Sequence, residues 1–241
     1  MTIMNPKDIN KKIVFSEEDH VYKNEKGEIL TSSTQLLSKY KKPFDETGII
    51  AKMCAKREGI STAEILKRWE DKKNASCVHG TAVHLEMETW INTGIIPNNQ
   101  YRPIVEELNR LPFDRSKLLA EVGLNSRRYM LAGTADILEN ISGRKYKIHD
   151  LKNTERFDLK PKYGNKFTYP LSELNECHLT TYSLQILLYG EMIKEWGFDF
   201  EPGWILHVNR VNGKIDKYDV LDLRKEVDTL LDHYLSMDGW W

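Results

Sequence analysis

The 241-residue chain has few cysteines, no long apolar run and almost no net charge. Three scattered thiols provide no disulfide framework and are typical of a reducing compartment. Because the chain lacks both a signal peptide and a run of about 18 apolar residues, we expect a cytoplasmic protein without a membrane partner. Internal repeats and linkers rich in proline, glycine or serine are also absent, so we expect a single domain, residues 1–241, around one core.

The net charge of −1 conceals an uneven distribution of charge. Residues 186–241 contain 6 basic and 11 acidic residues, and subtraction from the totals of 35 and 36 leaves 29 and 25 for residues 1–185, a net charge of +4. Residues 38–73 alone contain 10 basic and 6 acidic residues. A phosphate backbone could run along such a face, although any single lysine is more simply part of a solvated helix surface.

Hydrophobic periodicity, helix caps and turn residues predict an α/β protein with a mixed sheet and helices on both faces. We expect an N-terminal hairpin and helical region (1–75), a core (76–221) and a C-terminal helix and tail (222–241). Trp240 and Trp241 are expected to pack back on the domain, and the alternatives are stacking on a base or docking of a partner. The predicted elements are a hairpin (13–30), a helix capped by Ser32 or Ser33, helices at 47–58, 62–71, 76–92 and 100–110, strands at 118–126, 128–139 and 145–152, a loop at 155–170, a helix at 173–196, strands at 203–211 and 214–221, and a helix at 223–235.

Asp136 and the segment Asp150-Leu151-Lys152 lie in two predicted strands joined by a turn at residues 140–143. Because side chains alternate along a strand, Asp150 and Lys152 share one face, and the hairpin would bring Asp136 next to Asp150. Two carboxylates on rigid strands suit Mg²⁺, and an ammonium group beside them could hold an attacking water or stabilise charge on a phosphate. The alternative is an exposed hairpin with a surface ion pair.

Further polar residues could complete such a site. His84 and Glu88 are one helical turn apart, so the imidazole could reach a metal with the carboxylate beside or behind it, although a lone helix histidine is more often a packed or surface residue. Gln185 and Tyr189 share the same spacing in a run so apolar that Tyr189 could simply be core. Glu121 is expected to be a salt-bridge partner or a support behind the ligands. The amides of Ser33 and Thr34, at a predicted helix start, could bind a phosphate.

The order of these motifs resembles that of nucleases of the PD-(D/E)XK superfamily, in the RecB-like branch. In that family the first acidic residue follows a small-residue turn and the second belongs to a D-x-K, as Asp136 and Asp150 do here. A helix with G-x-x-x-H precedes them, and a helix with Q-x-x-x-Y follows. The matching residues are 80–84 with Glu88, 133–136, 150–152 and 185–189, and residues 20–37 more loosely resemble the start of phage-type and mitochondrial exonucleases.

The resemblance implies a restriction-endonuclease-like fold with an added N-terminal helical region. It also implies that His84, Asp136, Asp150 and the Leu151 carbonyl hold the metal and that Lys152 is catalytic. Mg²⁺ is the expected cofactor, and Mn²⁺ is expected to substitute for it. Some relatives carry an iron–sulfur cluster on four cysteines, which is not expected here because the three cysteines, Cys54, Cys77 and Cys177, are far apart. The substrate would contact Gln185, Tyr189, Ser33 and Thr34.

The function implied by the resemblance is a metal-dependent DNA exonuclease of recombination, repair or replication. The expected substrate is DNA with free ends or single-stranded DNA. No G-x-x-x-x-G-K-[ST] motif occurs, so unwinding would need a partner such as a helicase, beside a possible annealing or single-strand-binding protein. Two alternatives remain open: a structure-selective or restriction-type endonuclease, and a non-catalytic accessory module that binds DNA or protein. The intact Asp136, Asp150 and Lys152 favour the enzyme, because a silent relative usually loses at least one of them.

Overall fold

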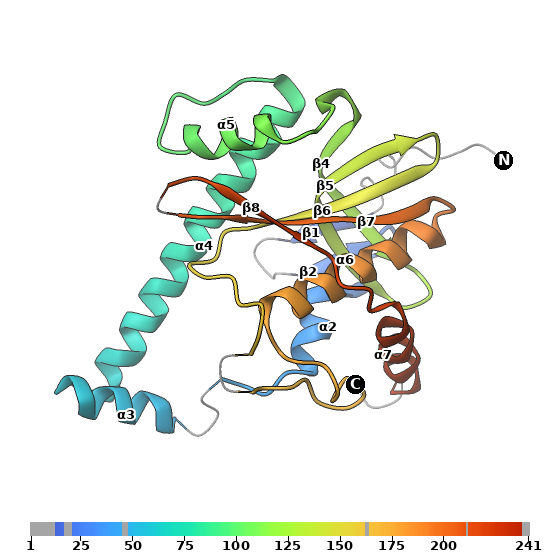
Figure 1. Cartoon of the computed structure of the whole chain (residues 1–241). Helices are drawn as coiled ribbons and strands as arrows, with labels where there is room; N and C mark the ends of the chain where they lie inside the picture. Colours follow the sequence, from blue (N-terminus) through green and yellow to red (C-terminus); the bar gives the residue numbers. More distant parts are fainter. Residues whose placement is uncertain (1–12, 17–20, 45–47, 162–163, 211, 238–241) are drawn as a thin grey trace.

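The computed structural model describes residues 13–16, 21–44, 48–161, 164–210 and 212–237. In these residues a mixed eight-stranded sheet is flanked by helices, which confirms the α/β prediction (Figure 1). The strands are β1 (Ile13–Ser16), β2 (Val21–Asn24), β3 (Ile29–Ser32), β4 (Leu118–Ser126), β5 (Leu131–Ser142), β6 (Lys145–Lys152), β7 (Asp199–Val208) and β8 (Ile215–Asp219). The helices are α2 (Ser33–Lys39), α3 (Ile49–Glu58), α4 (Thr62–Thr93), α5 (Arg102–Arg110), α6 (His178–Glu195) and α7 (Arg224–Ser236), with a 3₁₀ turn η1 (Arg115–Lys117).

The sheet is organised around β5. β4 pairs antiparallel with one edge of β5, from Leu118 opposite Glu139 to Ser126 opposite Leu131. On the other edge, β3 pairs in parallel with residues 131–132, and β6 pairs antiparallel from residue 137 onward. Because a strand has only two edges, β3 and β6 share this one. Among the described strands, none pairs with residues 133–136 on that side, and this break in the ladder is where the predicted site residues lie.

The remaining strands extend the sheet in both directions. β1, β2 and β3 form an antiparallel ribbon, whereas β6 continues into a parallel pair with β7, which pairs antiparallel with β8. The stretch 13–24, expected to be the first strand of a hairpin at 13–30, contains two paired strands, β1 and β2, so the hairpin is formed by β2 and β3, with Lys26 and Gly27 between them as predicted. Its turn was predicted correctly: the Asn24 side chain accepts hydrogen bonds from the amides of Lys26 and Glu28. Residues 17–20 and the tail at 238–241, with Trp240 and Trp241, lie outside the described residues.

Two apolar clusters attach helices to the two faces of the sheet. Ile148 of β6 packs in a cluster with Leu188 of α6, which also includes residues of α2 and α7. Leu151 of β6 packs in the other cluster, with Met87 of α4. Side chains alternate along a strand, so Asp150, two residues after Ile148, belongs to the face that α6 covers. The site therefore lies where this face meets the break in β5.

α4 is one continuous helix of 32 residues, whereas two helices at 62–71 and 76–92 were predicted. No glycine or proline lies between these segments, so nothing ends the helix, and the expected division between residues 75 and 76 falls inside it. The Ser61 side chain accepts a hydrogen bond from the Glu64 amide at its start, and Gly94 ends it with a φ of 77°. Its first half and α3 extend beyond the sheet as a helical region (Figure 1).

Two other predicted boundaries were wrong for local reasons. α6 begins at His178 and not near residue 173, because Asn175 pairs with Lys166 in an isolated β-bridge. β7 begins at Asp199 and not at 203, because a register shift between Ile148 and Asp150 of β6 accommodates Pro202 within the strand. Residues 155–170 contain neither a helix nor a regular strand in their described part, as predicted. No helix within the described ranges has both the length and the apolar character needed to cross a membrane.

Candidate metal centre

Strand registers bring three carboxylates into one row across the sheet. The β4–β5 ladder places Glu121 level with Asp136. The β5–β6 ladder pairs Ile137 with His149, so Asp150 lies level with Asp136 on the other side. The predicted meeting of Asp136 and Asp150 across a hairpin is therefore present. Asp136 is the central member of the row.

Glu121 has a backbone φ of 47°, in the left-handed region that residues other than glycine rarely adopt. The β4–β5 ladder pairs the residues on both sides of Glu121 but not Glu121 itself. Such a conformation costs about 1–3 kcal/mol, and this kind of strain is concentrated at functional sites. The Glu121 carboxylate lies 3.0 Å from Nδ1 of His84. The salt-bridge role predicted for Glu121 is thus confirmed, and its register opposite Asp136 also places its carboxylate beside that residue.

His84 projects from α4 toward these carboxylates. Its Nδ1 lies 3.0 Å from Oε1 of Glu121 and 3.6 Å from Oδ1 of Asp136. Burial by itself would lower the pKa of His84, but Asp136 and Glu121 raise it to about 9. Without a metal, the imidazole is therefore protonated at neutral pH and forms ion pairs with both acids.

The ligand atoms of His84, Glu121 and Asp136 lie within 4.8 Å of one another. Two ligands on opposite sides of an ion such as Mg²⁺, each about 2.1 Å from it, are about 4.2 Å apart, so small side-chain rotations would suffice to hold one cation. Carboxylates suit Mg²⁺ and Mn²⁺, and a mixed imidazole–carboxylate set also suits Zn²⁺. The donor set thus fits a divalent cation, which would replace the proton on His84.

Asp150 lies beside this group and is paired with Lys152. Its side chain is 1% exposed, and Oδ1 accepts a hydrogen bond from the Lys152 Nζ at 2.7 Å. The other oxygen, Oδ2, is buried and has no hydrogen-bond partner among the described residues. Burial raises the pKa of Asp150 to about 6, although Lys152 acts in the opposite direction. An unsatisfied carboxylate oxygen at this position is suited to a cation.

Lys152 is held as a charged ammonium. Burial alone would lower the pKa of Lys152, but Asp150 and Asp136 outweigh burial and raise it. Its Nζ also lies 4.9 Å from the centre of the Tyr182 ring, on α6. A positive charge is therefore fixed beside the carboxylates with few alternative positions.

The Leu151 main chain connects the two aspartates. Its amide donates a hydrogen bond to Oδ2 of Asp136 at 2.6 Å. In an extended strand the amide and the carbonyl of one residue point toward the same neighbour, so the Leu151 carbonyl is directed to the side on which Asp136 lies. The side chain points the other way, into the cluster with Met87. This arrangement is compatible with the predicted carbonyl ligand.

α6 closes the site from the other side with a buried polar pair. Gln185 donates from Nε2 to the Tyr189 hydroxyl at 2.8 Å. Burial, followed by the charge of Asp150, raises the pKa of Tyr189, so the hydroxyl remains neutral. A Cβ on Gly133 would lie 2.4 Å from the Tyr189 ring, which explains the small residue before Asp136. The predicted pair is thus packed on the break in β5.

Ser33 and Thr34 have different surroundings. Ser32 caps α2 with a reciprocal pair of hydrogen bonds to Gln35, and the Ser33 side chain is buried. Thr34 lines a cavity of about 270 Å³ that also reaches Tyr189. Only Thr34 of the two predicted phosphate-binding residues therefore directs a side chain toward this space. The cavity is lined by Phe15, Tyr22, Ser32, Thr34, Gln35, Gly133, Thr134 and Tyr189.

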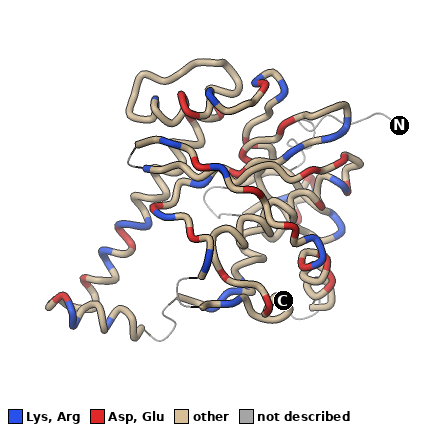
Figure 2. The backbone as a smooth tube through the Cα atoms, in the orientation of Figure 1, with Lys and Arg blue, Asp and Glu red and all other residues tan. Residues whose placement is uncertain are grey.

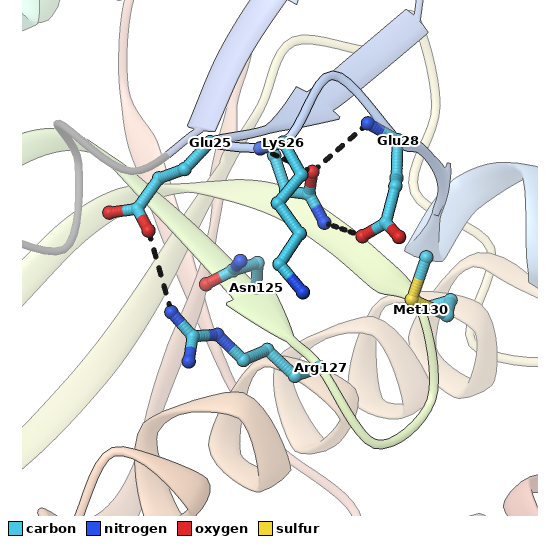
Figure 3. A pocket seen from close by; sticks show the side chains of 7 residues that line it. Glu25, Lys26, Glu28, Asn125, Arg127 and Met130 are labelled. Carbon is cyan, nitrogen blue, oxygen red and sulfur yellow. Dashed lines mark hydrogen bonds and ion pairs between the residues drawn. The ribbon is translucent and has the colours of Figure 1, made fainter.

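Glu88 is not part of the group of possible metal ligands. In the described chain this group consists of His84, Glu121 and Asp136. His84 is supported by Glu121 from another element and not by the acid one turn along its own helix. A separate cavity of about 200 Å³ lies between the β2–β3 and β4–β5 turns, with an ion pair of Glu25 and Arg127 at 3.5 Å (Figure 3). None of the predicted site residues lines it.

No protein-family model and no curated protein matches the sequence.

Proposed function

We propose that this protein is a divalent-metal-dependent nuclease that hydrolyses phosphodiester bonds in DNA, with a restriction-endonuclease-like catalytic core. The observation that supports this most is the convergence of Asp136, Asp150 and Lys152 at the break in β5, beside His84 and Glu121. Acidic ligands next to a fixed ammonium are the combination that phosphodiester hydrolysis needs, because negative charge grows on the phosphate in the transition state.

His84, Glu121 and Asp136 would hold the cation, with Asp150 and the Leu151 carbonyl reaching it from β6. Such an ion, when bound, lowers the pKa of a water and neutralises charge on the phosphate. The Lys152 ammonium would donate a hydrogen bond to a non-bridging phosphate oxygen or hold the attacking water. The neutral Tyr189 hydroxyl, oriented by Gln185, would donate to the substrate from the α6 side.

We further infer an exonuclease. The cavity of about 270 Å³ beside Tyr189 has room for part of one strand, which agrees with a substrate that enters by an end. A linear substrate with free termini would therefore be degraded, and a covalently closed circle of the same sequence would resist. Rapid cutting of closed circles would instead identify an endonuclease.

The decisive measurement is hydrolysis of end-labelled linear DNA by purified protein with Mg²⁺, Mn²⁺, Ca²⁺ or EDTA. We expect cleavage with Mg²⁺ or Mn²⁺, binding with little cleavage in Ca²⁺, and no cleavage in EDTA. Asp150→Asn, which preserves side-chain size, should remove nearly all activity, whereas the exposed control Asp222→Asn should retain it. Turnover in EDTA, or a wild-type rate for Asp150→Asn at an unchanged melting temperature, would reject the proposal. Tight DNA or protein binding without cleavage under any condition would favour an accessory module.

A further inference from the structure

The metal centre does not account for a groove on the helical region beyond the sheet. We call this region, α3 and residues 62–76 of α4, the arm. A groove of about 390 Å³ on the arm is lined by Phe44, Trp69, Lys72, Lys73 and Ser76, and we call it the arm groove. Its four helical members are spaced i, i+3, i+4 and i+7, so they share one face of α4.

Two aromatic rings form one end of the arm groove. Phe44 is 74% exposed, and its ring meets the Trp69 ring edge to face, with centroids 5.5 Å apart and an interplanar angle of 61°. In this arrangement the edge of one ring contacts one face of the other, so other ring faces are left on which a flat third ring can stack. Trp69 also packs against the α3–α4 cluster of Ala51, Ala55 and Ile65, whereas the exposed Phe44 ring leaves apolar surface open to a ligand.

Positive charge follows the aromatic rings along the groove. Residues 48–76 contain seven basic and four acidic residues, which alternate along the arm (Figure 2). Lys72 pairs with Glu155 at 2.6 Å and Lys73 with Glu70 at 3.9 Å, and all four side chains are at least 60% exposed. Exposed pairs of this kind contribute little, so a phosphate could displace either carboxylate.

The same face of α4 leads from the arm groove to the metal centre. Lys73, Gly80 and His84 lie close to one line along the helix, because eleven residues complete nearly three turns. Among the described residues, a Cβ on Gly80 would meet no atom within 4 Å, so no side chain in that part of the chain explains a glycine in this helix interior. A ligand that approaches the helix backbone does explain it.

A second connection runs through the sheet. Ser76, at the inner end of the arm groove, accepts a hydrogen bond from Arg210 at 3.2 Å. Arg210 also donates to the carbonyl of Asn153, the residue after Lys152, at 3.0 Å. The inner end of the groove is thus fixed to the end of the strand that carries Asp150 and Lys152.

We propose that the arm groove binds single-stranded nucleic acid, with a base stacked on Trp69 and Phe44 and the adjoining phosphates on Lys72 and Lys73. The proposal rests on the nuclease function, because the strand would continue past Gly80 to the metal centre. The fifteen residues from Trp69 to His84 span about 22 Å, or about six nucleotides at stacked spacing. Unpaired bases are required, since paired bases cannot offer a free face to the rings.

The test measures the binding of a fluorescein-labelled thymidine oligonucleotide by anisotropy in EDTA, so that no hydrolysis is needed. Trp69→Leu and Phe44→Ala should each weaken binding about tenfold or more, and Trp69→Phe should restore most of the affinity. Leucine preserves apolar packing without a stacking face, which separates stacking from loss of folding. Val78→Ala, on the opposite face of α4 and 71% exposed, is the matched control and should bind as the wild type does.

Charge and backbone access are tested separately. Lys72→Gln and Lys73→Gln should each reduce the slope of log affinity against log salt concentration by about 0.7, whereas Lys67→Gln, on another face, should leave it unchanged. Gly80→Ala should raise the melting temperature, because alanine favours the helix, and yet weaken binding of oligonucleotides long enough to reach His84. A loss of binding that accompanies a gain in stability cannot come from misfolding.

Unchanged affinity in Trp69→Leu and Phe44→Ala would overturn the proposal. If these two variants also convert a wild-type dimer into a monomer in sedimentation, the arm groove is an interface between copies of the chain. If the groove variants bind DNA more weakly but the wild type hydrolyses no DNA, the groove proposal is supported and the nuclease proposal is rejected. If the wild type hydrolyses DNA but the groove variants bind as it does, the nuclease proposal is supported and the groove proposal is rejected.

Discussion

Lys152 Nζ lies 2.7 Å from one oxygen of the buried Asp150, and the other oxygen of that carboxylate has no hydrogen-bond partner in the described structure. The ammonium is the main group that offsets the burial of this carboxylate. Removal of one member of a buried ion pair costs far more than replacement of both members.

The first prediction concerns the stability of this pair. Lys152→Met should reduce the free energy of unfolding by about 3 kcal/mol at neutral pH, because it leaves a buried carboxylate without its partner. The double variant Asp150→Asn with Lys152→Met should recover most of this loss. Urea unfolding of the metal-free proteins measures both values. Asp150→Asn alone completes the cycle, and a double variant that loses the sum of the two single losses would show that the pair is not coupled.

The second prediction concerns the backbone strain at Glu121. Glu121→Gly and Glu121→Ala both remove the carboxylate, but only glycine adopts a φ of 47° without steric cost. The glycine variant should therefore be more stable than the alanine variant by about 1 kcal/mol. Both variants should bind Mn²⁺ more weakly than the wild type. If alanine proved as stable as glycine in thermal unfolding, the left-handed conformation at Glu121 would be refuted.

The third prediction concerns pH. The His84 pKa of about 9 means that the metal-free protein holds a proton where a metal ligand must be neutral. Mn²⁺ affinity should therefore rise as the pH increases toward 9, and binding at pH 7.5 should release about one proton per ion. Calorimetry in buffers of different ionisation enthalpy counts this proton. The His84→Gln variant should bind Mn²⁺ weakly and release no proton. If it released as many protons as the wild type, the released proton would come from another group.

Asp150, on the neighbouring strand β6, sets a lower pH limit for hydrolysis. Because burial raises the pKa of Asp150 to about 6, acidification through pH 6 protonates it and removes its negative charge. Hydrolysis at subsaturating metal concentration should thus fall below about pH 6, and more metal should move this limit to lower pH, because the cation and the proton compete for the carboxylate. A pH–rate profile of the wild type, measured beside the exposed control Asp222→Asn, checks this limit.

The fourth prediction concerns the contact between β5 and α6. A methyl group at Gly133 would lie 2.4 Å from the Tyr189 ring, so Gly133→Ala should destabilise the protein by about 1–3 kcal/mol through overpacking. Adding Tyr189→Ala should relieve this clash, so the two changes should cost less together than the sum of their separate effects. Thermal unfolding of both singles and the double gives the coupling. Additive effects would mean that the two residues do not touch.

The strands of the site were predictable because their determinants are local. Residues 118–126 and 145–152 were predicted with the bounds that the structure has, since alternation and turn residues define them. The meeting of Asp136 and Asp150 followed from the turn between their strands. The pairing of β3 with β5 was not predictable, because it joins residues about one hundred positions apart.

Glu121 was predicted to be a salt-bridge partner, and its 3.0 Å contact with His84 confirms this, but its backbone conformation was not predictable. Its side chain reaches His84 from a conformation that sequence propensity assigns to glycine or asparagine, so nothing in the residue itself indicates it. Glu88 was favoured because helical spacing is readable, whereas the approach of α4 to β4 is set by tertiary packing. The arm groove could not be predicted from the sequence either, because it depends on the contact of Phe44 with Trp69, which lies 25 residues further along the chain.

The continuity of α4 restricts how the chain can tolerate insertions and deletions. Each residue added between Trp69 and His84 would rotate everything before it by about 100° around the helix axis, which would turn the arm groove away from the metal centre. Insertions of about seven or eleven residues would nearly restore the direction while lengthening the path by about 10 or 16 Å. Length changes in this helix should therefore come in whole turns, whereas the loops on either side of it are free to vary by single residues.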